Sequence, residues 1–194
     1  MTANARRAQI VAAAVDTIAE LGYARASFAK IAERAELSST RLISYHFKGK
    51  FDLIQAVVDE ALALADDYMG PRIRAASTKT EALDAYIRSN MEYMREYPNH
   101  VRAMVDIFNN AQDEGADVSS GNLGTAVDLL TEQFAIGQRD GEFRDFDPLV
   151  MAASLRGSID AAAAQLAHNP DLDVDAYGAE LAELFRLATR KDPS

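Results

Sequence analysis

The chain has 194 residues, of which 48% are hydrophobic and 26% charged, a balance that favours a folded globular protein over a disordered one. It contains no cysteine, which excludes disulfides, zinc–thiolate sites and cysteine nucleophiles. The net charge is −10, but it is unevenly distributed. Residues 1–50 hold eight Lys/Arg and four Asp/Glu, a net charge of +4, whereas residues 51–194 hold twelve Lys/Arg and twenty-six Asp/Glu, a net charge of −14. This distribution predicts an anionic partner at the N-terminal end.

Apolar residues repeat at intervals of three and four along most of the chain, whereas the period-2 alternation of strands is absent. The fold class is therefore predicted to be all-α, with about nine helices. The first four helices are expected over residues 5–21, 28–35, 39–45 and 50–69. Gly22 is expected to end the first helix, Ser27 to cap the second, and Gly70-Pro71 to end or kink the fourth.

The later helices carry start signals of their own. Thr78 and Glu81 have the spacing of a capping box, and Asp147-Pro148 is a cap followed by proline at the first helical position. A polar loop is expected over residues 115–121, after which Asn122 can cap a helix. The last five helices are expected over residues 79–97, 99–114, 122–140, 148–168 and 174–190. No run of about 18 apolar residues occurs, so no membrane span is expected and the cytoplasm is the expected location.

The most informative pattern lies over residues 27–53, where a tight turn at residues 36–38 separates two short helices. A helix-turn-helix needs an apolar underside on both helices and a polar outer face on the second. The underside is expected from Phe28, Ile31, Ala32, Ala35, Leu37 and Leu42. Residues 37–51 contain three cations and no acidic residue, which suits the DNA backbone. Arg41 is the long donor that could reach guanine in the major groove.

Several motifs between residues 6 and 62 occur together: a first helix ending in L-G-Y, then I-A-E-R-A, then S-x-x-x-L, then Y-H-F-K-G-K-F-D-L. In this combination the chain resembles the TetR family of transcription regulators. By position, the resemblance implies that Ser27 contacts phosphate, Tyr45 the DNA backbone, and Lys50 a phosphate at the start of the fourth helix. The residues expected at DNA are Ser27, Ser38, Ser39, Thr40, Arg41, Ser44, Tyr45, His46, Lys48 and Lys50.

Two departures from the family pattern concern the turn. The family has glycine where this chain has Glu36, and a non-glycine residue with positive φ is strained. The segment from the turn to Y-H-F is also one residue longer than the common family spacing. The register of the second helix against the bases can therefore differ by one position.

The resemblance also implies a function and a domain organisation. Residues 1–50 would form a three-helix DNA-binding domain and residues 51–194 a larger helical domain for effector binding and dimerisation. The expected function is that of a repressor that binds a palindromic double-stranded operator as a homodimer and is released by a small-molecule effector. No cofactor, metal or membrane partner is expected.

Two groups of residues in the second domain are candidates for these roles. The effector pocket is expected from Tyr86, Asn90, Met91, Met94, Met104, Phe108, Phe134, Met151 and Arg156. The dimer interface is expected from Ala153, Gly157, Ala161, Ala164, Leu181, Leu184 and Phe185. Each residue of both groups could equally belong to an ordinary core within one chain.

Two alternatives belong to other classes of protein. The acidic body and Glu36 would fit a helical adaptor that does not bind DNA. An enzyme is disfavoured because the chain lacks the Glu-x-x-His pattern of helical di-iron sites, and also G-x-S-x-G, a P-loop and a dinucleotide-binding loop.

Overall fold

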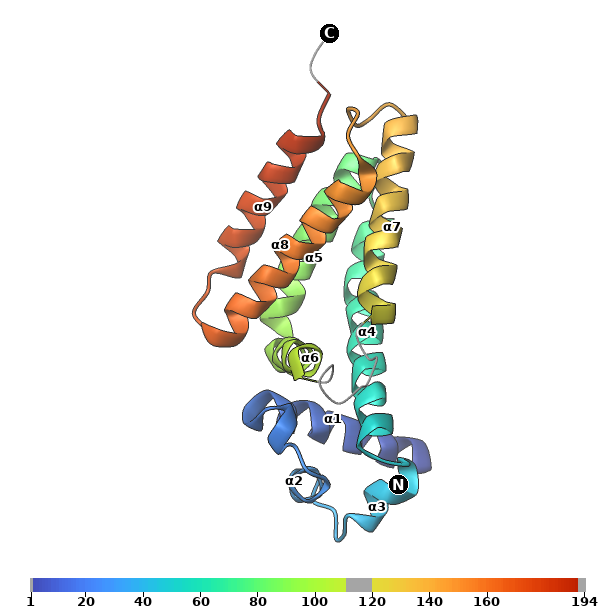
Figure 1. Ribbon diagram of the computed structural model, residues 1–194, viewed down its shortest axis with the longest axis vertical. Helices are drawn as coiled ribbons and strands as arrows, with labels where there is room; N and C mark the ends of the chain where they lie inside the picture. The colour runs from blue at the N-terminus through green and yellow to red at the C-terminus, as the bar shows by residue number, and fades with distance from the viewer. Residues whose placement is uncertain (1, 111–119, 192–194) are drawn as a thin grey trace. The chain divides into compact units, whose positions relative to one another are not determined.

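The structure is a computed structural model that describes residues 2–110 and 120–191, the side chains of residues 120–124 excepted. Over these residues the chain forms nine α-helices and a 3₁₀ turn, and a single bridge between Phe143 and Arg190 is its one β-type pairing (Figure 1). The all-α prediction is confirmed. The helices are α1 Ala3–Leu21, α2 Phe28–Arg34, α3 Arg41–His46, α4 Lys50–Arg74, α5 Lys79–Glu96, α6 Pro98–Asn110, α7 Ser120–Arg139, α8 Pro148–His168 and α9 Val174–Thr189, and the 3₁₀ turn η1 is Tyr23–Arg25.

Three predicted helix starts are confirmed by capping hydrogen bonds. The Ser27 hydroxyl accepts from the N–H of Lys30 at 3.3 Å, and the Asp147 carboxylate accepts from the first free N–H groups of α8. At α5 the Thr78 hydroxyl accepts from the N–H of Glu81 at 3.1 Å, as the capping box predicts. The Glu81 carboxylate reaches one residue further than expected and accepts from Ser77 at 2.8 Å.

One predicted helix end is wrong, because α4 continues through Gly70-Pro71 to Arg74. Pro71 has no N–H to donate, but it is exposed, so water can satisfy the carbonyl that is left without its helical donor. The next turn then forms normally, with the N–H of Ala75 bonded to the carbonyl of Pro71 at 3.1 Å. Residues 115–119 of the predicted loop lie outside the described residues, and residues 120 and 121 belong to α7. The side chain of Asn122, the predicted cap, is also outside the described part of the chain.

The described chain forms two compact units, each with its own packing. Unit 1 comprises Met1–Leu64 and Tyr97–Ser119, and unit 2 comprises Ala65–Glu96 and Ser120–Ser194. The continuous helix α4 contributes its first part to unit 1 and its last part to unit 2. The predicted division into a DNA-binding domain over residues 1–50 and an effector-binding and dimerisation domain over residues 51–194 stays a prediction.

The core of unit 1 forms around α1, as its apolar stripe predicts. Fully buried side chains of α1 include Ile10, Ala14 and Ile18, and α4 adds Leu53 and other residues to the same cluster. α6 packs against α1 and completes this core with buried residues of its own, although it follows α5 in the chain. The three short segments η1, α2 and α3 are therefore held on a scaffold of three longer helices.

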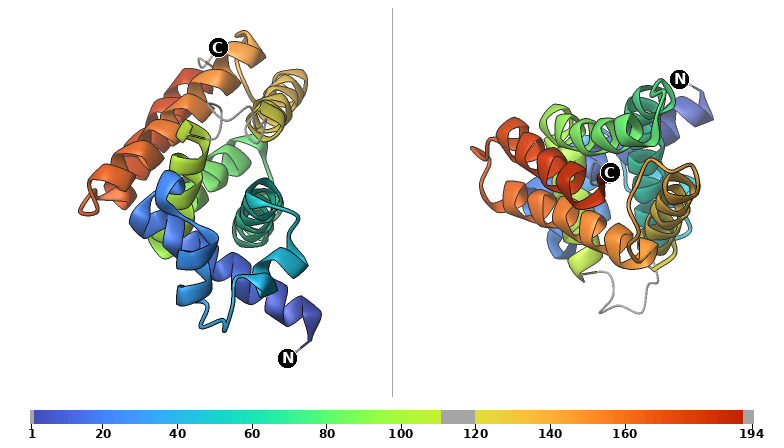
Figure 2. Two further views of the ribbon diagram at one scale, coloured as in Figure 1. Left: turned by 60° about the horizontal axis from the view of Figure 1, so that its bottom comes forward. Right: turned by 90° about the horizontal axis from the view of Figure 1, so that it is seen from above.

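In unit 2, α5 lies antiparallel to α9, and α7 lies antiparallel to α8 (Figures 1 and 2). α5 packs mainly on α9, and α7 on α8. α5 and α9 approach closely at Gly178, which has no side chain. A Cβ at this position would lie 2.6 Å from Met91 Cγ. No helix of the described chain is long and apolar enough to cross a membrane.

Candidate nucleic-acid interface

The turn after α2 is a Schellman motif, in which the chain leaves the helix through a left-handed residue. The N–H of Leu37 bonds to the carbonyl of Ala32 at 2.9 Å, and the N–H of Glu36 bonds to that of Glu33 at 3.1 Å. Glu36 has a φ of +51°, the left-handed conformation that the sequence indicated. Leu37 packs against the core of unit 1 and closes the motif. The tight turn of a helix-turn-helix is thus formed without glycine.

Replacing Glu36 with glycine is expected to raise the free energy of unfolding by about 1 kcal/mol, because glycine adopts positive φ without steric strain. Chemical denaturation of both proteins measures the difference. Glu36→Asn serves as a matched control, since asparagine tolerates this conformation and also removes the charge. A Glu36→Gly protein that is less stable than the parent would show that the backbone of Glu36 is not strained.

Side chains of α1 fix the position of α2. Gln9 Nε2 donates to the carbonyl of Ala35 at 2.8 Å and so satisfies a carbonyl at the end of α2, while Arg6 orients the Gln9 amide through a 2.8 Å hydrogen bond. Arg34 in the last turn of α2 pairs with Glu20 of α1. Sequence reasoning missed these contacts, because nothing in the periodicity marks a polar residue that bridges two helices.

Helix α3 is anchored from below by Ile43, which is completely buried, and by Phe47 just after its end. The predicted underside residue Leu42 is only half-buried, so Ile43 takes the main anchoring role. α3 begins two residues later than predicted, because Ser39 precedes the helix and its hydroxyl accepts from the N–H of Arg41 at 3.1 Å. This anchoring turns the other side of α3 toward solvent.

The outer face of α3 carries the side chains that the sequence assigned to DNA. Arg41 and Ser44 are exposed, and Tyr45 is 81% exposed. Of the ten predicted DNA residues, eight are exposed: Ser27, Ser38, Ser39, Thr40, Arg41, Ser44, Tyr45 and Lys48. His46 and Lys50 are half-buried. Tyrosine, serine and arginine are all side chains that contact DNA phosphates.

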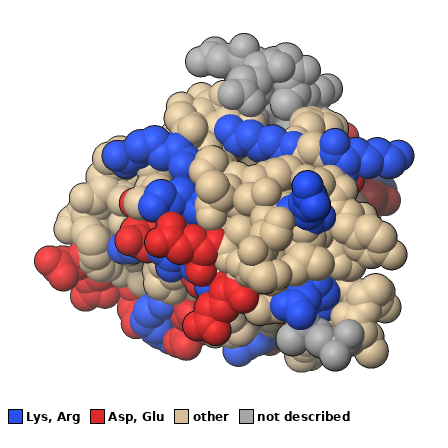
Figure 3. All heavy atoms as spheres, turned by 90° about the horizontal axis from the view of Figure 1, so that it is seen from below, with Lys and Arg blue, Asp and Glu red and all other residues tan. Residues whose placement is uncertain are grey.

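Cations flank this outer face. The Lys50 ammonium lies 3.8 Å from the centroid of the Tyr23 ring, and the Arg7 guanidinium lies 4.9 Å from that of Phe47. Lys48 is exposed just before the start of α4. Figure 3 shows the molecule from the side of the helix-turn-helix, with Lys and Arg spread across the view and Asp and Glu gathered on one side of it. We name Arg7, Lys48 and Lys50 the cationic rim.

The predicted effector residues fall into both units. Seven lie on helices of unit 2: Tyr86, Asn90, Met91 and Met94 on α5, Phe134 on α7, and Met151 and Arg156 on α8. Met104 and Phe108 instead lie on α6 and pack against the core of unit 1. Met91 is committed to the α5–α9 contact, whereas Tyr86 and Arg156 meet directly.

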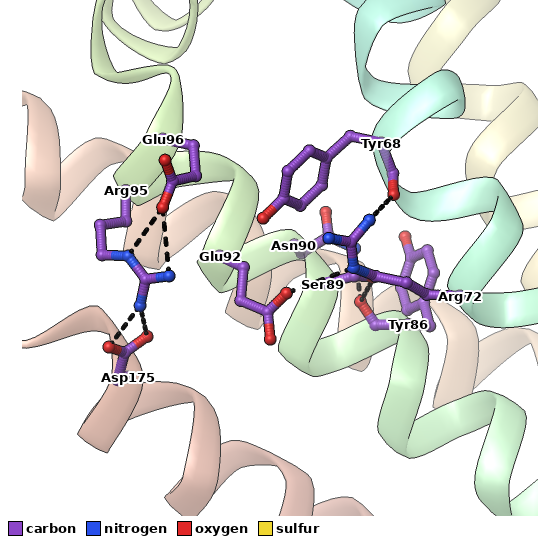
Figure 4. Close-up of polar contacts among 9 residues, drawn as sticks. All are labelled: Tyr68, Arg72, Tyr86, Ser89, Asn90, Glu92, Arg95, Glu96 and Asp175. Carbon is purple, nitrogen blue, oxygen red and sulfur yellow. Dashed lines mark hydrogen bonds and ion pairs between the residues drawn. The ribbon is translucent and has the colours of Figure 1, made fainter.

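Polar side chains in unit 2 gather along α5, where it faces the end of α4 on one side and the start of α9 on the other (Figure 4). Asn90 is only 5% exposed, and its Nδ2 donates to the carbonyl of Tyr86 at 2.8 Å. Arg72 of α4 lies over the Tyr68 ring at 4.0 Å and pairs with Glu92 at 3.5 Å (Figure 4). The Arg72 guanidinium is thereby neutralised by a carboxylate.

Arg156 is the most enclosed guanidinium of this cluster. Its Nε donates to Asp160 Oδ1 at 2.9 Å, and its Nη1 meets the Tyr86 hydroxyl at 3.4 Å. Burial lowers the pKa of Arg156, but the Asp160 carboxylate and the Tyr86 hydroxyl outweigh this and leave the pKa above its ordinary value. Arg156 therefore stays charged and paired.

α8 and α9 lie side by side (Figure 2), and each leaves apolar residues exposed to solvent. The exposed residues are Leu149, Val150, Ala153, Gly157 and Ala161 of α8, with Leu184 and Leu187 of α9. We name this set the α8–α9 face. Ala164 is half-buried, while Leu181 and Phe185 are buried within the chain. The predicted dimer residues thus divide between an exposed face and an internal core.

Comparison with known proteins points to one class of protein. Residues 10–57 match the family model for bacterial regulatory proteins of the tetR family. The HTH-type transcriptional regulator RutR of Escherichia coli (strain K12) is 29% identical over 151 residues, which cover 75% of this chain and 68% of RutR. The HTH-type transcriptional regulator BetI of Cronobacter sakazakii is 31% identical over 105 residues, 53% of this chain and 52% of BetI. These relatives are transcription regulators rather than enzymes.

Solved structures share the fold. The fatty acid degradation regulator FadR from Bacillus halodurans superposes with a TM-score of 0.81 at 20% identity, over 92% of this chain and 97% of FadR. FadR from Bacillus subtilis, solved in complex with stearoyl-CoA, has a TM-score of 0.78 at 23% identity, over 91% and 96% of the two chains.

Proposed function

The chain belongs to the TetR family of DNA-binding transcription regulators, and from this premise we propose that it is a repressor that binds a palindromic operator as a homodimer and is released by a small-molecule effector. The observation that carries the proposal is the exposed face of α3, where Arg41, Ser44 and Tyr45 project beside the cationic rim. A short, well-anchored helix with this chemistry fits the major groove. The protein would act in the cytoplasm, where the chromosome lies.

Selection of DNA from a random pool by the purified protein tests DNA binding. The expected result is a palindromic sequence whose half-site centres lie about one helical turn, 34–36 Å, or a multiple of it apart. Affinity for the selected DNA should fall steeply with salt, because Lys and Arg displace condensed counterions. Failure to enrich any sequence at any salt concentration would favour the adaptor alternative.

Lys48 provides a test of the binding to phosphate. It is exposed and lies in the short segment between α3 and α4, so truncation of its side chain should leave the fold intact. Lys48→Ala is expected to weaken binding to all sequences alike and to reduce the salt slope by about 0.9 for each phosphate that the lysine neutralises. Lys79→Ala, in unit 2, is the matched control and should leave both quantities unchanged. A sequence-dependent effect of Lys48→Ala would contradict a pure phosphate contact.

The homodimer is proposed from the α8–α9 face. Several large apolar side chains exposed on two neighbouring helices are the kind of feature that marks an interaction site. Small residues on α8 let a second helix approach closely, and large ones on α9 supply the buried area. A second copy of the same chain would cover this face by a self-complementary contact, as twofold dimers do, and would match the symmetry of a palindromic operator.

The effector is proposed to bind in unit 2 beside Tyr86, Asn90 and Arg156. Asn90 donates through its Nδ2 to the carbonyl of Tyr86, and its Oδ1 would accept from a ligand donor. Arg72 and Arg156 already pair with carboxylates, and residues 51–194 balance at −14, so a strongly anionic ligand is disfavoured. The expected effector is a largely apolar, uncharged molecule with a hydroxyl or amide N–H.

A thermal-shift comparison tests this ligand class. Medium-chain alcohols and primary amides, each tested separately, are expected to raise the melting temperature by about 3 °C when present at roughly ten times the Kd, and stearoyl-CoA is expected to give no shift. Asn90→Leu should abolish the shift without preventing folding, because leucine has a similar volume. A shift with stearoyl-CoA alone would contradict the class.

A further inference from the structure

A carboxylate of α6 holds the backbone at the start of the DNA-binding motif. Asp106 Oδ2 accepts the N–H of Tyr23, the first residue of the 3₁₀ turn that links α1 to α2. This N–H is unsatisfied within its own turn, so Asp106 caps it from a helix 83 residues away in the chain. Asn110, one turn further along α6, donates to Asp106 Oδ1 at 3.1 Å and orients the carboxylate.

The backbone around Tyr23 is shaped for this contact. Gly22 has a φ of +85°, which brings the turn against α6, and a Cβ at this position would lie 3.5 Å from Asp106 Oδ2. The Tyr23 ring is buried and receives the Lys50 ammonium at 3.8 Å. Tyr23 therefore connects α6 through its backbone with the first residue of α4 through its ring.

We propose that Asp106 is a positioning residue for DNA binding, which holds the α1–α2 junction and thereby the orientation of α2 and α3. Ser27, the N-cap of α2, is only four residues after Tyr23, so displacement of the turn displaces the whole motif. Lys50 belongs to the cationic rim, so its placement depends on the same turn. Asp106 itself contacts no base or phosphate in this scheme. This role in DNA binding rests on the proposed function, whereas the contact itself can be tested in the free protein.

The experiment compares Asp106→Ala and Asp106→Asn in the full chain. A hydrogen bond to a charged group contributes the equivalent of roughly ten- to hundredfold in an equilibrium constant. Asp106→Ala is expected to speed hydrogen exchange at the Tyr23 amide at least about tenfold and to weaken operator binding about tenfold, because the binding-competent geometry is less populated. The salt slope should stay unchanged, since every group that meets a phosphate is still present. Asp106→Asn keeps an acceptor oxygen and should restore both readouts.

Two further variants keep the outcome decisive. Gly22→Ala strains the same turn from the other side and should reproduce the signature of Asp106→Ala even if that protein folds poorly. Asn109→Ala removes an exposed amide from the same helix and should behave like the parent. The proposal is overturned if both Asp106→Ala and Gly22→Ala bind the operator normally, or if Asp106→Asn behaves like Asp106→Ala. If the parent protein binds no operator, the proposed function fails, while unchanged exchange at Tyr23 in Asp106→Ala would refute the contact alone.

Discussion

Replacing Leu184 with glutamate is expected to convert the homodimer into monomers and to weaken operator binding at least about 100-fold. Leu184 is 58% exposed on α9, among the apolar residues proposed to meet a second copy. In a twofold contact each substitution occurs twice, so two carboxylates would be buried across the axis without partners, at a cost of several kcal/mol. A monomer also reaches only one half-site, so the joint binding of two motifs no longer operates.

Sedimentation analysis and operator titration measure the two effects separately. Leu129→Glu is the matched control, because Leu129 is 57% exposed on α7 of the same unit but lies outside the α8–α9 face. This variant carries the same change in charge and should remain dimeric with full operator affinity. A Leu184→Glu protein that stays dimeric would show that another surface joins the subunits.

The α8–α9 face also shows what sequence patterns cannot predict. The periodicity of α9 identifies Leu181, Leu184 and Phe185 as apolar residues of one helix, but it does not say which of them face the chain's own core. The structure buries Leu181 and Phe185 against neighbouring helices and leaves Leu184 in solvent. When a helix has apolar residues on two sides, only the packing in three dimensions shows which side faces the core and which could form an interface.

Local signals, in contrast, were sufficient for several helix starts and for the turn before α3. Ser27 and Asp147-Pro148 predicted helix starts because a cap depends on residues three or four positions away. The positive φ of Glu36 was indicated by its place in the turn. The contact of Asp106 with Tyr23 left no such signal, since it joins helices that are distant in the chain. Met104 and Phe108, predicted as effector residues, pack against the core of unit 1, and their part in effector binding stays a prediction.

Arg41→Ala is expected to remove preference at one base pair in each half-site while changing non-specific affinity little. The guanidinium is exposed at the first residue of α3 and pairs with no described carboxylate, so it is free to donate two hydrogen bonds to guanine. Such a bidentate contact contributes roughly 1–3 kcal/mol of discrimination. The preference at that position should therefore fall about 5- to 150-fold in competition assays against single-base operator variants.

Arg41→Lys separates base reading from charge. Lysine keeps the positive charge, so the salt slope should match the parent, but its ammonium lacks the planar fork that pairs with two guanine acceptors. Most of the discrimination should disappear in this variant too, whereas Lys48→Ala keeps the preference and binds all sequences more weakly. Unchanged preference in both Arg41 variants would move the base contact to a neighbour on the same face, with Ser44 and Tyr45 as the next side chains to test. The additional residue before Y-H-F would shift the base contact by one position along α3. The base-pair preferences of these variants therefore also determine the register of α3 in the groove.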